Sequence, residues 1–369
     1  MRTSQKWTFI ILSTIAMIMM ALLILSREYP AFVTRWYTGK MFPVITIPLR
    51  TVSGLIPFSL GEMLLIGLII GFLVGSIVRI VRSIRYRTWK PLLKGLYGVA
   101  ILLLVVVILF PVMGGFNYSR QTFAQMAGYE IAFASVEELE QLCKYLGKKA
   151  AAERNILPQD EAGITQSPIT ILEILDKAQE GYDRIAVAYP WLSGNYGTPK
   201  IAIHSRIMSY LRISGIYPYL VPEAIVNTNT PIMSLPHTVY HEMAHQRGIA
   251  REDEANFVGY LAAIHHSEAI FRYSGYLEAY IYSMDALYQV SPERWHAVRQ
   301  LTHRGILRDI AYIHSVWAPY TTTNNVIGEI STNVNDWYLK ENAVEDGVQS
   351  YGRMVDLLIA YQKYPISRE

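Results

Sequence analysis

The sequence predicts a mainly helical protein with a small β-sheet, preceded by a module of three transmembrane helices. Hydrophobic residues make up 51% of the chain and its mean hydropathy is positive, which points to a membrane protein. Three long apolar runs lie near the N-terminus, and helix-start signals recur along the rest of the chain. At 369 residues the chain is long enough for a membrane module over residues 1–119 and one folded domain over residues 120–369.

Each of the three apolar runs is long enough to cross the hydrocarbon core of a bilayer. Residues 7–26 and 95–115 contain no charged residue, and residues 58–78 contain only Glu62, which we expect at the membrane interface. We therefore predict spans over about these three ranges. A cleavable signal peptide is the alternative for the first run, but no small-x-small cleavage site precedes Arg27.

Lys and Arg residues are distributed unevenly around these spans. The loop at 79–94 holds six of them and no acidic residue, and the N-terminal segment holds Arg2 and Lys6. The longer loop at 27–57 holds four, together with Glu28. Because positively charged loops stay cytoplasmic, we predict a multi-pass protein of the cytoplasmic membrane with its N-terminus inside and its folded domain outside. The basic 79–94 loop is expected to contact anionic headgroups of the lipid bilayer.

Charge also separates the two parts of the chain. Residues 1–114 carry 12 Lys and Arg against 2 Asp and Glu, whereas the remaining residues carry 21 against 28. A net-acidic folded domain argues against nucleic acid as a partner, because nucleic-acid binding requires a basic surface. The single cysteine, Cys143, lies among leucines and is expected in a helix core, so no intrachain disulfide can form.

The first half of the folded domain shows helix signals followed by strand signals. A capping box begins a predicted helix over residues 135–154. A Ser-Pro pair begins a second predicted helix over residues 168–189. Between these helices and the C-terminal part, strand-like runs lie at residues 200–204 and 224–227. These two runs are the source of the predicted small sheet.

The C-terminal part is predicted to be helical. One helix begins at Ser234, and a second follows it and continues past His266. Another Ser-Pro pair begins a helix over residues 292–317, and a last helix is predicted over about residues 345–364. The adjacent histidines His265 and His266 point to different sides of a helix, so we do not expect them to bind a metal.

The sequence His241-Glu242-Met243-Ala244-His245 is the most informative pattern in the chain. On a helix, two imidazoles four residues apart lie on one face, so both can bind one zinc ion. Glu242 lies beside them, where it can take a proton from a zinc-activated water. The alternative, a pair of surface histidines, does not explain why an acidic cluster directly follows.

That acidic cluster offers a third ligand, since a catalytic zinc site usually has three protein ligands and one open position. We predict Glu252 as this ligand, with Glu254 as the competing choice and Asp253 as a weaker one. If the segment is helical, Asn256 shares a face with Glu252 and can support a ligating imidazole. Gly248 would allow the sharp turn between the two helices. Carboxylates are also favoured at any helix N-terminus, which is the alternative explanation of the cluster.

The HExxH pattern followed by Glu-x-x-Ala-Asn at residues 252–256 resembles the zincin metallopeptidases. It is most similar to the gluzincin branch, in which a Glu ligand is followed four residues later by Asp or Asn. The metzincin branch is also similar, but its third histidine would fall on Arg251. The distance from His245 to Glu252 is shorter than in thermolysin-like enzymes. Over most of its length the chain also resembles a bacterial family of multi-span membrane proteins with an extracytoplasmic HExxH domain, which carries the sequence found here at 251–256.

This resemblance implies a zincin-like α+β catalytic domain and a membrane-anchored zinc metallopeptidase. Such an enzyme would hydrolyse peptide bonds of extracytoplasmic proteins or peptides, with Zn²⁺ on His241, His245 and Glu252 and with Glu242 as general base. It further implies that residues 223–229 line the active site and pair with the substrate backbone. The oxyanion needs another donor, and the downstream candidates are His303, His314 and Tyr320.

Two other functions fit parts of the sequence. A catalytically silent zinc-binding sensor or scaffold at the cell envelope would use the same ligands, although it would not need Glu242. An intramembrane protease would place the HExxH motif inside the bilayer, but residues 240–254 carry too many charges for a lipid-facing span.

Overall fold

The computed structural model describes residues 3–132, 134–321 and 352–363. Within these residues the protein is mainly helical with one three-stranded sheet, which confirms the predicted fold class. The chain divides into two compact units. The first consists of Met1–Gln121 with Pro218–Glu223, and the second of Thr122–Tyr217 with Ala224–Glu369. The predicted domain boundary at residue 119 stays a prediction, and the sequence gives no sign that residues 218–223 belong to the first unit.

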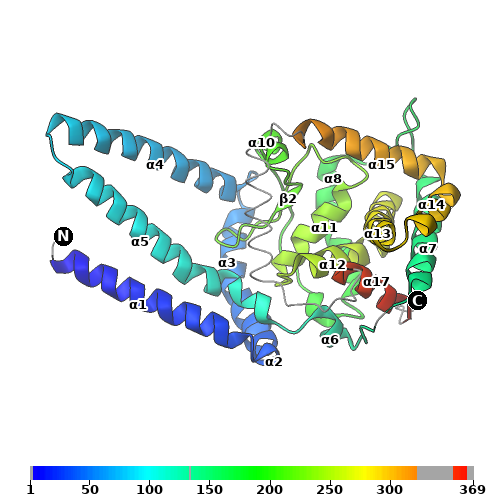
Figure 1. Ribbon diagram of the computed structural model, residues 1–369, viewed down its shortest axis with the longest axis horizontal. Coiled ribbons are helices and arrows are strands. Elements are labelled where there is room, and N and C mark those ends of the chain that lie inside the picture. The colour runs from blue at the N-terminus through cyan, green and yellow to red at the C-terminus, as the bar shows by residue number, and fades with distance from the viewer. Residues whose placement is uncertain (1–2, 133, 322–351, 364–369) are drawn as a thin grey trace. The chain divides into compact units, whose positions relative to one another are not determined.

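Three long apolar helices dominate the first unit: α1 (Thr3–Ser26), α4 (Leu60–Arg85) and α5 (Lys90–Met113). Each is long and apolar enough to cross a membrane, with hydropathies of 2.6, 2.6 and 2.9. Within this unit α1 and α4 each pack against α5 (Figure 1, blue to cyan). Most of their apolar side chains are exposed, as expected for helices that face lipid. These helices match the predicted spans and indicate a membrane protein.

The segment between the first two long helices is helical, although the sequence predicts only a loop there. It forms α2 (Pro30–Phe32), a π-helical stretch η1 (Val33–Met41) and α3 (Phe42–Gly54). The hydroxyl of Tyr37 donates to the carbonyl of Val112 at 2.8 Å, at the end of α5. Thr38 donates to the side chain of Asn117 at 2.8 Å, in the 3₁₀ turn η2 (Gly115–Ser119). These contacts fold the segment back onto the first unit.

Glu223 is a buried carboxylate of the first unit. It accepts hydrogen bonds from the amides of Leu60 and Gly61 at 3.3 and 3.1 Å, and from the hydroxyl of Ser59 at 3.2 Å. The hydroxyl of Ser53 donates to it as well. These donors surround the N-terminus of α4, where unpaired amides and the helix dipole favour a negative charge. Glu223 therefore binds the N-terminus of α4 within the first unit.

The second unit is built around α11 (Leu235–Gln246), α12 (Glu252–Ile264) and α13 (Ala269–Val290), which pack on one another. Helix α7 (Val136–Arg154) packs along α13 and begins at the predicted capping box. Buried side chains of these helices form one core, which includes Cys143 as predicted. Other helical elements of this unit are α6 (Phe123–Ala127), α8 (Ile171–Lys177), α9 (Gln179–Ile185), η3 (Pro190–Leu192), α10 (Ser205–Tyr210), α14 (Pro292–Leu301), α15 (Arg304–Trp317), η4 (Ala318–Tyr320) and α17 (Arg353–Lys363).

The sheet has the order β1-β3-β2, with β1 (Lys200–Ile201), β2 (Gly215–Ile216) and β3 (Ile225–Val226). Strand β1 runs parallel to β3, and β2 runs antiparallel to it. Because β3 is paired on both sides, its backbone cannot accept a substrate strand. The expectation that residues 223–229 pair with substrate is therefore wrong. The sequence around Gly215 contains many aromatic and turn residues, so it does not predict this short strand.

Two predicted helices are each divided in the structure. The range 168–189 contains α8 and α9, because Thr170 and not Ser167 provides the N-cap. Thr170 and Glu173 form a reciprocal capping box, which begins α8 three residues later than predicted. The range 292–317 contains α14 and α15, since the backbone leaves the helical conformation at Thr302. Helix α17 lies inside the predicted range 345–364, of which residues 345–351 and 364 lie outside the described residues.

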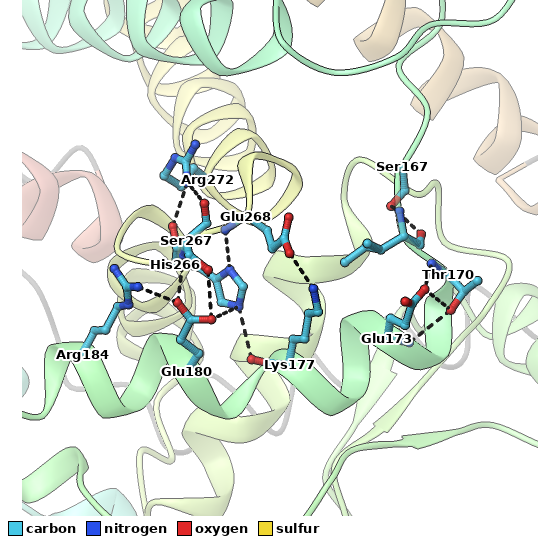
Figure 2. Close-up of polar contacts among 11 residues, drawn as sticks. Ser167, Thr170, Glu173, Lys177, Glu180, Arg184, His266, Ser267, Glu268 and Arg272 are labelled. Carbon is cyan, nitrogen blue, oxygen red and sulfur yellow. Dashed lines mark hydrogen bonds and ion pairs between the residues drawn. The ribbon is translucent and has the colours of Figure 1, made fainter.

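The sequence also predicts a helix that continues past His266, whereas α12 ends at Ile264. Figure 2 shows the contacts that fix the turn before α13. Glu180 of α9 accepts hydrogen bonds from the amide and the hydroxyl of Ser267 at 3.1 and 3.0 Å. The Nδ1 atom of His266 accepts from the amide of Glu268 at 2.9 Å. The His266 ring thus holds the turn between α12 and α13.

Candidate metal centre

The end of helix α11 positions the second histidine of the motif. Gly248 has a φ of 76°, so it provides the predicted sharp turn. The amide of Ile249 donates to the carbonyl of Ala244 at 3.2 Å, and that of Gly248 donates to the carbonyl of His245 at 3.0 Å, which is a Schellman turn. This turn brings the carbonyl of Ile249 to the ring of His245, whose Nδ1 donates to it at 2.7 Å. The Nε2 atom of His245 consequently faces the other way.

The first histidine is held by helix α12. The side-chain oxygen of Asn256 lies 2.8 Å from Nδ1 of His241. An amide oxygen only accepts hydrogen bonds, so Nδ1 must carry the proton. In the neutral ring this leaves the lone pair on Nε2, as it does in His245. Both rings therefore have the tautomer that ligates a metal through Nε2, each fixed by a hydrogen bond from its other nitrogen.

Glu252 completes a compact group. The two Nε2 atoms are 3.1 Å apart. Oε2 of Glu252 lies 3.0 Å from Nε2 of His241, and Oε1 lies 3.6 Å from Nε2 of His245. The candidate ligand atoms of the three residues all lie within 4.8 Å of one another. His241, His245 and Glu252 are thus brought together by two consecutive helices and the Gly248 turn between them.

These distances and donor types fit a zinc ion. Ligand atoms at about 2.1 Å from a tetrahedral zinc are about 3.4 Å apart, close to the separations found here. Two imidazoles and one carboxylate form a common donor set of catalytic zinc, with a fourth position for water or substrate. The side chain of Glu252 is 40% exposed, whereas that of His245 is only 7% exposed, so the group opens to solvent on the Glu252 side.

The charges of the group also favour a cation. Burial lowers the pKa of His245, but the nearby Glu252 carboxylate more than offsets this and raises that pKa to about 9. Burial alone would raise the pKa of Glu252, yet the two imidazoles hold it well below its usual range. The carboxylate therefore stabilises a positive charge at this point, whether a proton or a metal ion provides it.

The competing ligand has a different environment. Glu254 is buried, and its Oε1 accepts hydrogen bonds from the amide of Phe123 at 3.0 Å and from the guanidinium of Arg251 at 3.2 Å. It lies two residues after Glu252 on α12, which directs it to another face of the helix. Glu254 accordingly anchors the start of α6 to α12.

Glu242 is buried beside the two histidines. Burial raises the pKa of its carboxyl to about 7, although His241 and His245 oppose this shift. The backbone of Gly215 in strand β2 comes so close that a Cβ atom there would lie 2.5 Å from Oε1 of Glu242. The ring of Tyr217, just after β2, stacks on His245 with centroids 6.2 Å apart. Strand β2 thus covers Glu242, which explains why glycine occupies position 215.

The other predicted side chains have varied surroundings. His303 caps α15, where its Nδ1 accepts from the amide of Gly305 at 3.2 Å. The ring of Tyr320 packs against Tyr210, with centroids 5.1 Å apart. Burial raises the pKa of Asp285 on α13, and the nearby His314 offsets part of this shift. The expectation that one of these three donates to the oxyanion stays a prediction.

The residue that sequence reasoning missed is Tyr282 of α13. Its hydroxyl accepts a hydrogen bond of 3.2 Å from the side-chain amide of Asn256, which also holds His241. No local motif marks it among the 26 tyrosines of the chain, since only the packing of α13 on α12 brings it to the site.

A family profile described as "Protein of unknown function (DUF3810)" matches residues 37–359. The matched range covers most of the chain, including α4, α5 and all the residues of the histidine–glutamate group. No curated protein and no solved structure matches the chain. The family description carries no activity, so the zincin resemblance stays a prediction.

Proposed function

The chain belongs to the DUF3810 family of proteins of unknown function, and from its histidine–glutamate group we propose that it is a membrane-anchored zinc metallopeptidase. One observation carries this proposal. His241, His245 and Glu252 converge at metal-binding distances, and the buried carboxylate of Glu242 lies next to them. A site that only retains zinc has no use for this fourth group, whereas hydrolysis requires a general base.

His241 and His245 would bind the ion through Nε2, and Glu252 through its carboxylate. When bound, zinc supplies Lewis-acid chemistry, because it acidifies water and polarises a peptide carbonyl. Asn256 and the carbonyl of Ile249 keep the two rings in the required orientation. Glu242 takes the proton of the water as its oxygen bonds to the carbonyl carbon. It later delivers this proton to the amide nitrogen as the C–N bond breaks and its electron pair moves onto that nitrogen.

The edge strand β2 supports a peptide as substrate. Among the described residues it is paired with β3 on one side only, and its Gly215 lies against Glu242. An extended peptide that hydrogen-bonds to this edge would place its backbone beside the general base. Backbone pairing makes little demand on sequence, so we propose extended segments of extracytoplasmic proteins or peptides as the substrate class.

The charge distribution supports a proposal for the location of the protein. The excess of Lys and Arg in the 79–94 loop and at the N-terminus supports a cytoplasmic position for both. The second unit would then lie outside the cytoplasmic membrane. Its net-acidic composition argues against nucleic acid as a partner. The three long apolar helices support the lipid bilayer as a partner of the first unit.

The test measures zinc content and peptide hydrolysis of the full-length protein in detergent. We expect about one zinc ion per chain in the wild type, and its loss in both His241→Ala and Glu252→Ala. His296→Ala is the control, because this histidine of α14 is exposed and its ring packs on Trp295 with centroids 4.8 Å apart. Glu242→Gln should keep the zinc but lose about 10²- to 10⁴-fold in the rate of casein cleavage.

The outcomes separate the candidate functions. Absence of zinc from the wild type contradicts the proposal entirely. Zinc that is bound, together with no cleavage of any protein or peptide tested, favours the sensor or scaffold function. Cleavage that survives Glu242→Gln would show that another group is the base.

A further inference from the structure

A chain of hydrogen bonds connects the candidate metal ligands to a tyrosine on a third helix. The side-chain oxygen of Asn256 accepts from Nδ1 of His241 at 2.8 Å. The NH₂ group of the same amide must then face away from the histidine, and it lies 3.2 Å from the hydroxyl of Tyr282. Because an NH₂ group only donates, Tyr282 accepts this bond.

The hydroxyl of Tyr282 consequently keeps its own proton for another partner. Within the residues that the structure describes, this proton has no acceptor. The Tyr282 residue is 40% exposed, and the side chain of Glu252 is exposed to the same extent. The hydroxyl therefore belongs to the solvent-accessible side of the metal group, where a substrate would approach.

The surroundings of Tyr282 keep it protonated. Partial burial of the side chain and the negative charges of Glu278 and Glu252 raise its pKa to about 12. A phenol with this pKa remains a hydrogen-bond donor throughout the neutral range. A phenol with so high a pKa is a poor general base at neutral pH, and the proposed general base is Glu242.

We propose that Tyr282 is a catalytic residue whose hydroxyl donates a hydrogen bond to the substrate oxygen that becomes negative when water adds to the peptide carbonyl. This inference rests on the proposed peptidase function. As the new C–O bond forms, the π-electron pair of the carbonyl moves onto its oxygen, and Glu242 takes the proton of the water. Tyr282 transfers no proton. Its hydrogen bond strengthens as the charge develops, which lowers the barrier more than it tightens substrate binding.

Tyr282 could instead act only through Asn256, as a positioning residue for His241. The two roles have different consequences. Loss of a positioning contact weakens zinc binding and disturbs the ring of His241. Loss of an oxyanion donor lowers kcat with little effect on zinc content or on KM.

The test compares Tyr282→Phe with the wild type in the full-length protein in detergent. The control is Tyr288→Phe, an exposed tyrosine of the same helix whose ring packs on Trp295 with centroids 5.3 Å apart. We measure zinc content, kcat and KM on a quenched fluorescent casein, and the Kd of a phosphinic tri-alanine peptide by calorimetry. The tetrahedral phosphinate imitates the oxygen that Tyr282 would stabilise, so its Kd reports on the role without turnover.

For Tyr282→Phe we expect kcat to fall about 10²- to 10³-fold and phosphinate affinity to fall with it, at unchanged zinc content and KM. Unchanged kcat and phosphinate affinity would overturn the inference while the peptidase function stands. Loss of zinc in this variant would also overturn it and make Tyr282 a positioning residue. A wild type that holds zinc but neither cleaves casein nor binds the phosphinate contradicts the proposed function itself.

Discussion

Two carboxylates of the second unit, Asp309 and Glu252, gather polar groups in opposite ways. Asp309 is fully buried and accepts hydrogen bonds from Arg154 at 2.7 Å, from the hydroxyl of Thr165 at 2.5 Å and from Tyr273 at 2.5 Å. Glu252 is partly exposed and faces two imidazole nitrogens. The Asp309 network is closed, because donors occupy its carboxylate from several sides. The Glu252 group is open, because its atoms converge on a common point that can bind a further partner.

The comparison shows how a structural polar cluster differs from a candidate site. A buried charge is tolerated in a core when its hydrogen bonds are satisfied, and the Asp309 network meets this condition with donors from α7, α13 and the segment around Thr165. The three groups at the candidate metal centre are all of the acceptor type once both rings carry their proton on Nδ1. Three acceptors placed together repel one another unless a cation or a proton joins them.

The largest expected effect is a loss of stability when the closed Asp309 network is broken. Arg154→Ala leaves the buried charge of Asp309 without its cation, so we expect the unfolding free energy to fall by about 3–5 kcal/mol. Denaturant unfolding of the full-length protein, followed by tryptophan fluorescence, measures this loss. The control is Arg184→Ala, because Arg184 is exposed and its pair with the half-buried Glu180 is in contact with solvent, so its loss should change stability by less than about 0.5 kcal/mol. An equal change in both variants would contradict the structural role.

The open group should respond differently to a single substitution. Asn256→Ala removes the acceptor that orients His241, so we expect zinc affinity to fall about 10- to 100-fold, which corresponds to about 1.4–2.8 kcal/mol. Competition with a zinc-binding dye measures this affinity. Asn256→Asp keeps an acceptor oxygen for Nδ1 of His241 and should retain most of it. Asn155→Ala, at the exposed end of α7, is the neutral control, and a loss there equal to that of Asn256→Ala would contradict the prediction.

The smallest effect is a pH dependence of the closed network. Burial alone would raise the pKa of Asp309, but the hydrogen bonds from Arg154, Thr165 and Tyr273 outweigh it and lower this pKa. A carboxyl with a lowered pKa in the folded state stabilises the protein above its unfolded pKa of about 3.9. That stability is lost as the pH falls through the folded pKa.

Denaturant unfolding of the wild type and of Asp309→Asn, from about pH 6 to about pH 3, tests this dependence. We expect the wild type to lose more stability on acidification than the variant, although the variant is less stable at neutral pH. Parallel curves would show that Asp309 does not contribute to acid sensitivity.

The sequence was informative wherever the geometry is local. His241, Glu242 and His245 are related by helical spacing on α11, as Glu252 and Asn256 are on α12, and the Gly248 turn between the helices is a local signal too. Helix starts were predicted less well where two N-caps compete, as at Ser167 and Thr170, since the better capping box wins.

Contacts between distant segments could not be predicted. Strand β2 consists of two residues, and its approach to Glu242 depends on pairing with β3. Tyr282 reaches Asn256 only because α13 packs on α12. A single sequence contains no pattern that specifies either contact, because each arises from tertiary packing of elements that are separated along the chain.

The short distance between the candidate ligands has a consequence for the order in which the molecule folds. All the groups that hold or orient the metal lie between residues 241 and 256, within two helices and one turn. The entropy lost on closing such a short loop is small, and local contacts form early. Strand β2 and Tyr282 reach the group only with the complete tertiary fold. On the proposed function, the folding chain would therefore acquire its metal before it acquires the means to bind and cleave a peptide, so hydrolysis would begin only when folding is finished.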